Sequence, residues 1–346
     1  GNTATYGTSA ANGAKLAFKE INAAGGVLGK QIQIVTADNK GEPSESTNAM
    51  TKVITQDKVV AVTGFTVSSC GIAGSSVAEG SKIPFVAAAT VNPKVTVDGN
   101  TGKVKNYTFR ACFIDSFQGN IGAQFALNSL KAKKVSILTD SSSDYSKGLT
   151  QIFKDSFTKN GGQIVGEEAY LQKDQDFKPV LTKLKAQNPD VLYIPGYYED
   201  VGKIIKQARE IGMNMPILGS DAWDSPKLAE IGGPQALNNT YFTNFYSIED
   251  RNPVSNAFVE AYKKEYGEVP DSMAAMGYDA ARLLVDAIKR ANSTDAAKIT
   301  KALAETKEFT SVSGPMYLND THDAVRGVVI VEMKDGKQVY KETIKP

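Results

Sequence analysis

Between Val59 and Ser81 the chain reads VVAVTGFTVSSCGIAGSSVAEGS. Its first four residues are apolar and predict a buried strand, and the small and apolar residues spaced by three and four after Cys70 predict a helix. Ser68 and Ser69 fall where the strand gives way to the helix, and free backbone N–H groups and the helix dipole attract an anion there. The nucleotide-phosphate motifs GxxxxGK[ST] and GxGxxG are absent, so we predict that the bound anion is a small carboxylate. Alternatively, the two serines only cap the helix.

Strand-like runs and amphipathic helices alternate over most of the chain, which predicts βαβ units and parallel sheets. Strands are expected at residues 31–37, 59–63, 84–89, 106–112, 134–139, 163–169, 191–195 and 216–218, with 241–246 extended. Helices are expected at residues 9–24, 44–56, 70–81, 117–131, 145–160, 177–187 and 201–211. The order indicates two successive α/β blocks.

A helical stretch from Pro253 to Thr306 follows the second block and has little strand character. We expect it to return and cover the first block. Two alternating segments, 327–333 and 338–343, then end the chain, joined by Lys334-Asp335-Gly336-Lys337 with its Asp-Gly turn signal. The predicted fold class is therefore α/β, with two doubly wound parallel-sheet lobes joined by a multi-strand hinge and a terminal β-hairpin in the second lobe.

The predicted N-terminal lobe comprises residues 1–115 and 248–316, and the predicted C-terminal lobe comprises residues 116–247 and 327–346. Residues 316–327 are expected to form the third crossover between the lobes. Several crossovers make a hinge, and ligands of such folds bind in the cleft at the carboxyl ends of the parallel strands.

The composition excludes several classes of partner. The 346 residues are 41% hydrophobic and 22% charged, which is ordinary for a globular protein. Lys plus Arg number 39 and Asp plus Glu number 38, so there is no basic field for nucleic acid and no polybasic segment for a membrane surface. No apolar run approaches the roughly 20 residues of a transmembrane helix. No leader pattern is visible, as expected of an intracellular or already processed chain.

His322 is the only histidine and lies in a turn-like polar stretch. Ser–His–Asp catalysis or a histidine metal site would have to rest on it, so we expect no enzyme, no metal and no cofactor. Cys70 and Cys112 have no metal-ligand spacing. They are predicted to be two buried thiols, with a single disulfide as the alternative.

Short motifs run in order along the whole chain. They are Tyr6-Gly7, Asn12-Gly13-Ala14, Glu20-Ile21-Asn22-Ala23-Ala24-Gly25-Gly26, Asn92-Pro93-Lys94-Val95-Thr96, Asp115-Ser116-Phe117-Gln118-Gly119, Tyr145-Ser146-Lys147-Gly148-Leu149, Gly219-Ser220-Asp221-Ala222-Trp223-Asp224-Ser225-Pro226 and Gly277-Tyr278-Asp279-Ala280. Each motif is weak alone. Together with the terminal hairpin, their order and spacing resemble the solute-binding proteins of branched-chain amino-acid (Leu/Ile/Val) ABC transporters, which have the type I periplasmic-binding-protein fold.

The resemblance implies an extracytoplasmic receptor, periplasmic or lipid-anchored at the outer face of the membrane. Such a receptor closes its lobes on a free aliphatic amino acid (Leu, Ile, Val or smaller) and delivers it to the membrane subunits of an ABC permease. The resemblance also implies a monomer without a cofactor. The alternative is a sensor or reporter module of the same fold, or a receptor for another small carboxylate or amide.

By position, the resemblance implies that Ser68 binds the ligand carboxylate and Asp221 its ammonium, since a buried ammonium needs a carboxylate partner. It implies that the Tyr197 hydroxyl reaches the ligand and that Tyr6 and Tyr145 line its side chain. A helix cap remains the alternative for Asp221, and plain packing the alternative for each tyrosine. The implied ligand-binding set is Tyr6, Thr66, Val67, Ser68, Ser69, Ala89, Thr90, Val91, Tyr145, Tyr197, Asp221, Ala222 and Trp223.

Two departures from the family pattern concern a loop and a strand. Val91 stands where family members place a threonine before Asn-Pro, so either the loop shifts to use Thr90 or one polar ligand contact is lost. Family members also carry a central strand before the position of Gly1. Its absence would leave two neighbouring strands with unpaired edges. We therefore expect upstream residues, or a different topology for the first lobe.

A third departure concerns the volume of the site. Ala222 and Trp223 follow Asp221, where a glycine commonly follows the acid in the family. Together with Phe65 and Val67, they predict a small or slender ligand, or a carboxylate that is not an amino acid.

Overall fold

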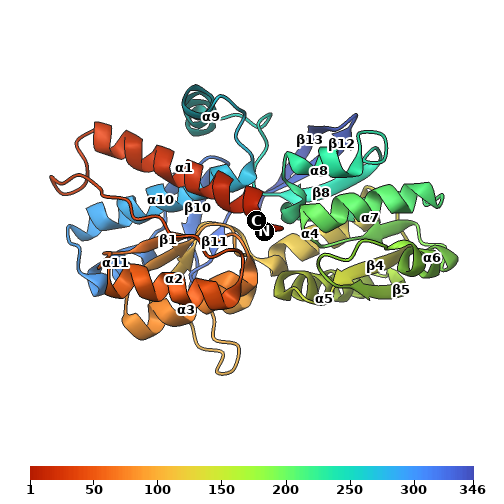
Figure 1. Cartoon of the computed structure of the whole chain (residues 1–346), viewed down its shortest axis with the longest axis horizontal. Helices are drawn as coiled ribbons and strands as arrows, with labels where there is room; N and C mark the ends of the chain where they lie inside the picture. Colours follow the sequence, from red (N-terminus) through yellow and green to blue (C-terminus); the bar gives the residue numbers. More distant parts are fainter. The chain divides into compact units, whose positions relative to one another are not determined.

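A computed structural model describes all 346 residues, and the chain divides into two compact units. Unit 1 contains residues 3–114 and 250–326, and unit 2 contains residues 115–249 and 327–346. Figure 1 follows the chain by colour through the elements of each unit. The chain passes from one unit to the other after Ile114, Glu249 and Arg326.

Unit 1 is built on a parallel sheet in the order β1 (Val62–Gly64), β2 (Phe85–Ala87) and β3 (Thr108–Arg110). Helices α1 (Ala4–Ala23), α2 (Pro43–Thr55), α3 (Ser68–Ser81), α9 (Pro253–Tyr266), α10 (Ser272–Ala291) and α11 (Ala296–Ala304) belong to the same unit. The expected return of the C-terminal helices to the first block is confirmed, because α10 packs against α1 and against β1 and β2.

Two glycines allow α1 and α10 to pack closely. A Cβ atom on Gly13 of α1 would lie 1.9 Å from the Ala274 carbonyl oxygen, and one on Gly277 of α10 would lie 2.0 Å from the Ala10 carbonyl oxygen. Neither backbone can yield without moving its whole helix. Both glycines belong to the motifs that carried the family resemblance, and the structure gives their physical reason.

A second, antiparallel sheet in unit 1 was not predicted. It contains β9 (Phe309–Ser311), β10 (Gly314–Leu318) and β11 (Ala324–Val325) in the order β11-β10-β9. Residues 316–326, which the sequence analysis treats as a crossover, thus lie in unit 1. These strands are too short and too polar to show a clear alternation of apolar residues.

The strand predicted at residues 31–37 is wrong. These residues have no ladder partner, and Ile34 and Val35 are each 40% exposed. The strand predicted from Val59 begins only at Val62, and Val60 is 45% exposed. β1 is an edge strand of its sheet. A strand forms only where a neighbour pairs its N–H and C=O groups, whatever the propensity of its residues.

Unit 2 is built on one mixed sheet in the order β13-β12-β8-β7-β6-β4-β5. Its strands are β4 (Lys134–Asp140), β5 (Gln163–Tyr170), β6 (Val191–Tyr193), β7 (Ile217–Gly219), β8 (Thr240–Asn244), β12 (Val328–Lys334) and β13 (Lys337–Ile344). Its helices are α4 (Asp115–Asn128), α5 (Asp144–Lys159), α6 (Lys178–Ala186), α7 (Tyr198–Glu210) and α8 (Lys227–Gly232). β4 to β8 are parallel, and β12 and β13 pair antiparallel.

The terminal hairpin is confirmed. Lys334 pairs with Lys337, and both turn residues have positive φ, 51° at Asp335 and 77° at Gly336. These are the angles of a type I′ turn, whose twist matches the strands beside it. The two cysteines are free and buried, as predicted for thiols. No helix in the structure combines the length and the hydropathy needed to cross a membrane.

The glycine contact between α1 and α10 gives a stability prediction. Gly13→Ala should lower the free energy of unfolding by about 2–4 kcal/mol, because the new methyl group must displace a backbone carbonyl. Gly7→Ala is the matched control in the same helix, since a Cβ atom there meets nothing within 4 Å. The control should be neutral or gain up to about 1 kcal/mol of helix propensity. Urea unfolding of both variants checks this, and equal stabilities would contradict it.

Candidate functional site

In unit 1 the junction between β1 and α3 turns sharply. Gly64 and Phe65 have φ of 130° and 67°, the second unusual for a residue with a side chain. Their carbonyl oxygens accept hydrogen bonds from the N–H groups of Ala88 (2.7 Å) and Ala89 (3.1 Å), just beyond β2. The turn therefore joins two strand ends and sets the direction in which α3 begins.

Helix α3 begins at Ser68, with Val67 as its N-cap and no side chain capping its first turn. The alternative in which Ser68 and Ser69 cap the helix is therefore wrong. Both are helix residues, and the N–H groups of the first turn are not taken by a cap. The Ser68 side chain is buried, and its hydroxyl accepts a hydrogen bond of 3.4 Å from the N–H of Asn92. An uncapped helix start beside a buried hydroxyl can receive a carboxylate.

Thr90 supplies a second hydroxyl near this helix start. Its side chain packs against Gly71 of α3, where an added Cβ atom would lie 2.7 Å from the Thr90 methyl carbon. Its hydroxyl is buried and has no hydrogen-bond partner. A buried polar group without a partner costs about 1–3 kcal/mol, so this hydroxyl is available to a ligand. Val91, the next residue, is also buried but offers only an apolar side chain.

A buried arginine holds the loop that carries Thr90. The Arg110 guanidinium, at the end of β3, donates to the carbonyl oxygens of Thr90 (2.6 Å) and Asn92 (2.9 Å) and to the Thr96 hydroxyl (2.9 Å). Its Nε lies 2.6 Å from the Asp323 carboxylate, and both side chains are almost completely buried. Sequence reasoning missed Arg110, because one arginine at the end of a strand-like run gives no signal.

In unit 2 the corresponding position is the end of β7. Asp221 follows Ser220 there and opens the short 3₁₀ helix Asp221–Trp223. It is 2% exposed, and its Oδ1 accepts hydrogen bonds from the Gln118 side-chain amide (2.9 Å) and the Tyr145 hydroxyl (2.8 Å). Asp221 makes no ion pair with a lysine, arginine or histidine. Burial raises the pKa of its carboxyl from 3.8 to about 6, against the hydrogen bonds from Gln118, Tyr145 and the Asp221 backbone, which lower it.

Two tyrosines stand beside Asp221 in unit 2. The rings of Tyr145 and Tyr197 are stacked with centroids 5.3 Å apart. The Tyr145 hydroxyl also bonds the Ser220 hydroxyl, and the Ser143 hydroxyl donates to the Tyr197 oxygen at 3.3 Å. Burial raises the pKa of Tyr145 well above its ordinary value, so Tyr145 remains a neutral donor. The structure therefore brings Tyr145, Tyr197 and Asp221 together in one unit.

The two aromatic residues expected to narrow the site lie inside their own units. Trp223 is completely buried, with its indole N–H donating to the Ile194 carbonyl at 2.9 Å and its ring over Gly219. The Phe65 ring packs edge-on against Phe85 at 5.0 Å, within the core between the sheet and α3. Both rings are thus held by contacts within their own units, and the expectation that they narrow the site stays a prediction.

The remaining predicted residues are also placed. Tyr6 is buried on α1, and Ala89 is buried beside Thr90. Thr66 is half-buried in the turn before α3, and Ala222 is buried next to Asp221. Unit 1 therefore holds Tyr6, Thr66, Val67, Ser68, Ser69, Ala89, Thr90 and Val91, and unit 2 holds Tyr145, Tyr197, Asp221, Ala222 and Trp223.

The lone histidine has a structural role. The His322 ring stacks on Phe109 with centroids 4.0 Å apart, and its Nδ1 bonds the Thr108 carbonyl at 3.0 Å. Burial lowers its pKa. No group of three or more histidine, cysteine or acidic side chains is placed to hold a metal ion.

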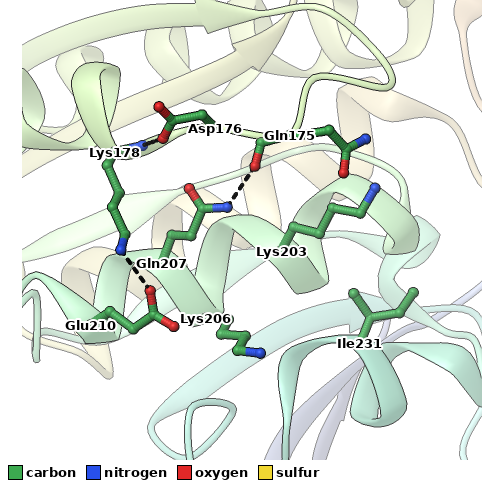
Figure 2. A pocket seen from close by; sticks show the side chains of 8 residues that line it. All are labelled: Gln175, Asp176, Lys178, Lys203, Lys206, Gln207, Glu210 and Ile231. Carbon is green, nitrogen blue, oxygen red and sulfur yellow. Dashed lines mark hydrogen bonds and ion pairs between the residues drawn. The ribbon is translucent and has the colours of Figure 1, made fainter.

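Unit 2 also has a surface groove of about 400 Å³ along α7, lined by none of the candidate residues. Figure 2 shows its lining groups already paired, with Lys178 3.0 Å from Glu210 and the Gln207 amide donating to the Gln175 carbonyl at 2.8 Å. Such exposed, mutually satisfied charges do not define a ligand.

Comparisons with known proteins agree with the resemblance carried by the motifs. The sequence profile described as "Periplasmic binding protein" matches residues 1–338. The Leu/Ile/Val-binding protein homolog 3 of Brucella melitensis is 30% identical over 345 residues, which are 99% of this chain and 91% of that one. Among solved structures, the leucine-binding protein LivK of Thermotoga maritima is 38% identical, with a TM-score of 0.93, over 99% of this chain and 95% of that one. The substrate-binding protein LivJ of Streptococcus pneumoniae, solved with isoleucine, is 36% identical, with a TM-score of 0.92, over 100% and 97%.

The buried pair in unit 1 gives the second prediction. Asp323→Ala should lower the free energy of unfolding by about 3–5 kcal/mol, because it leaves the Arg110 guanidinium charged, buried and without its counter-ion. Asp320→Ala, three residues away on the same loop but exposed, should change it by less than about 0.5 kcal/mol. Chemical denaturation of the two variants is the measurement. Equal effects would show that the pair does not hold the loop.

Proposed function

The chain belongs to the periplasmic binding protein family, and we propose that it is an extracytoplasmic receptor for a free aliphatic amino acid. Leucine, isoleucine, valine or a smaller residue would be bound and delivered to the membrane subunits of an ABC permease. The observation that supports this proposal most strongly is the environment of the Asp221 carboxylate. It is buried at the end of a parallel strand, accepts hydrogen bonds from two neutral side chains and has no cationic side chain as a partner. A charged carboxylate in such a setting is best balanced by the ammonium group of a ligand.

Unit 1 offers groups that suit the carboxylate of an amino acid. The uncapped start of α3, the Ser68 hydroxyl and the unpartnered Thr90 hydroxyl together suit a carboxylate. We propose Thr90 in the role that family members give to the next position along the chain. The carboxylate and the ammonium of a zwitterion would then be read by different units of the chain.

This division of labour suggests how binding changes the protein. A ligand that satisfies both units stabilises the conformation in which both reach it, by its differential affinity for that conformation. Micromolar affinity corresponds to about −8 kcal/mol, a plausible yield for one buried zwitterion. The chain would act as a monomer in the periplasm, or as a lipid-anchored receptor at the outer face of the membrane.

The relatives support an aliphatic ligand. One relative is named for leucine, isoleucine and valine, and one solved structure contains isoleucine. The walls that this chain offers, Val67, Val91 and the Tyr145 ring, are apolar or aromatic. They suit a branched aliphatic side chain by burial of its surface.

A thermal-shift screen of the twenty amino acids and a set of amine-free carboxylates tests this proposal. An amino acid at about 100 times its dissociation constant should add about 2.7 kcal/mol to stability, and its amine-free counterpart much less. Asp221→Ala should abolish the thermal shift while the protein stays folded. Asp155→Ala, an exposed change on α5, should keep the thermal shift. A shift by amine-free carboxylates alone would replace the proposal with a receptor for simple carboxylic acids.

The pH dependence of binding provides a separate test. The pKa of Asp221 is raised to about 6 by burial, so its carboxyl takes up a proton as the pH falls through that value. A protonated carboxyl cannot balance an ammonium, so the dissociation constant of the amino acid should rise about tenfold for each pH unit below 6 and level off above 7. Calorimetric titration between pH 4.5 and about 8 measures this. Asp221→Asn should bind weakly with little pH dependence, and a flat wild-type profile would remove Asp221 from the site.

A further inference from the structure

Gln118 engages Asp221 from two sides. Its side-chain N–H donates to Oδ1 of Asp221 at 2.9 Å, and its carbonyl oxygen accepts from the Asp221 backbone N–H at 3.1 Å. Gln118 lies in the first turn of α4 and is 1% exposed. One side chain from a different element therefore fixes both the backbone and the carboxylate of the residue proposed to bind the ammonium.

The Asp221 backbone N–H determines which way the Gln118 amide points, and the Thr243 hydroxyl supports that orientation. The Thr243 hydroxyl donates to the Gln118 oxygen at 2.7 Å, so that oxygen accepts from two donors. A flipped amide would turn its NH₂ group towards the obligatory N–H of Asp221, which cannot accept. The second proton of the NH₂ group faces Oδ1 of Asp115 at 3.5 Å. All four hydrogen-bonding positions of this buried amide are thus used.

The register of the sheet places Thr243 at this point. β7 and β8 are parallel with Gly219 opposite Phe242, so Thr243 is level with Ser220, one residue before Asp221. Thr243 is 1% exposed, and its hydroxyl has no role in the β8 ladder. Burying the Thr243 hydroxyl costs free energy, and its hydrogen bond to Gln118 gives a reason for a polar residue at this position.

Both side-chain donors of the network bond the same oxygen of Asp221. Oδ1 is occupied by Gln118 and Tyr145, and neither of these side chains donates to Oδ2. The titratable groups around Asp221 are Asp115 on α4, Tyr145 on α5, Tyr193 on β6 and Asp224, with no basic side chain among them. Two neutral donors on Oδ1 therefore keep the carboxylate ionised in an otherwise acidic environment.

We propose that Gln118, supported by Thr243, is the positioning residue that keeps Asp221 ionised, aims its Oδ2 at an ammonium, and so selects amine-bearing ligands over amine-free carboxylates. The proposal rests on the proposed function, because it names the group of the ligand that Asp221 reads. Gln118 itself touches no ligand in this scheme and acts only through Asp221.

The experiment compares two ligands with the same side chain, L-leucine and 4-methylpentanoate, which lacks the ammonium group. Dissociation constants are measured by calorimetry from pH 5 to about 8 for wild type, Gln118→Met and the exposed control Gln151→Met on α5. Gln118→Met should weaken leucine binding about 10- to 100-fold at neutral pH. It should also move the midpoint of the pH profile of leucine binding upward by about one pH unit. The dissociation constant of 4-methylpentanoate should stay within about threefold of the wild-type value. Gln151→Met should match wild type in every respect.

Thr243 provides a second, milder test. Thr243→Val removes one of the two donors to the Gln118 oxygen and should weaken leucine binding about three- to tenfold. Thr243→Ser keeps a hydroxyl and should retain leucine binding close to that of wild type. A Gln118→Met variant with the wild-type pH profile and the wild-type preference for leucine would overturn the inference. The inference would also be overturned if Gln118→Met lost the same affinity for both ligands and Thr243→Ser bound leucine no better than Thr243→Val. That result would indicate a structural role alone. If wild type itself does not prefer leucine, the proposed function fails first, and that result is read without any variant.

Discussion

A buried carboxylate that lacks a cationic partner is the constraint around which unit 2 is arranged. Ionised Asp221 at the end of β7 is unfavourable in a dry environment, and burial accordingly raises its pKa to about 6. Gln118 and Tyr145 limit the penalty with neutral hydrogen bonds to the carboxylate, and Thr243 bonds to Gln118, without removing the charge. In the proposed function, the carboxylate is satisfied in part by the protein and would be completed by the ammonium group of a ligand.

In unit 1, by contrast, the buried carboxylates are paired with buried arginines. Asp323 is paired with Arg110 and Asp279 with Arg326, so neither carboxylate is left for a ligand. A buried ion pair by itself adds little to stability, because desolvation offsets the attraction. The value of Arg110 lies in shape, since its remaining N–H groups fix the carbonyls of the loop that presents Thr90 beside α3. The groups that unit 1 offers to a carboxylate are thus backbone and hydroxyl dipoles, with no formal charge among them.

The sequence predicted those parts of the protein that depend on local pattern. The parallel strands of unit 2, the helices and the hairpin at Asp335-Gly336 follow from periodicity and turn chemistry, and the structure contains them. The segment 31–37 has the composition of a strand and is not one, since pairing is decided by neighbours that a local pattern does not contain. Ser68 and Asp221 were predicted because a motif or a strand end marks them. Arg110, Gln118 and Thr243 were missed, because their roles arise from contacts between residues far apart in the chain.

The candidate residues of unit 1 and those of unit 2 differ in how strongly they can discriminate between ligands. A helix start carries roughly half a positive charge and accepts any small carboxylate, so unit 1 offers affinity with little selectivity. A buried carboxylate discriminates strongly, because a ligand without an ammonium leaves it charged and unpaired. In the proposed function, selectivity for amino acids over simple acids would therefore come from unit 2. It would depend on whether Asp221 is ionised when the ligand arrives, which would make the neutral residues that hold the carboxylate as decisive for the class of ligand as the carboxylate itself.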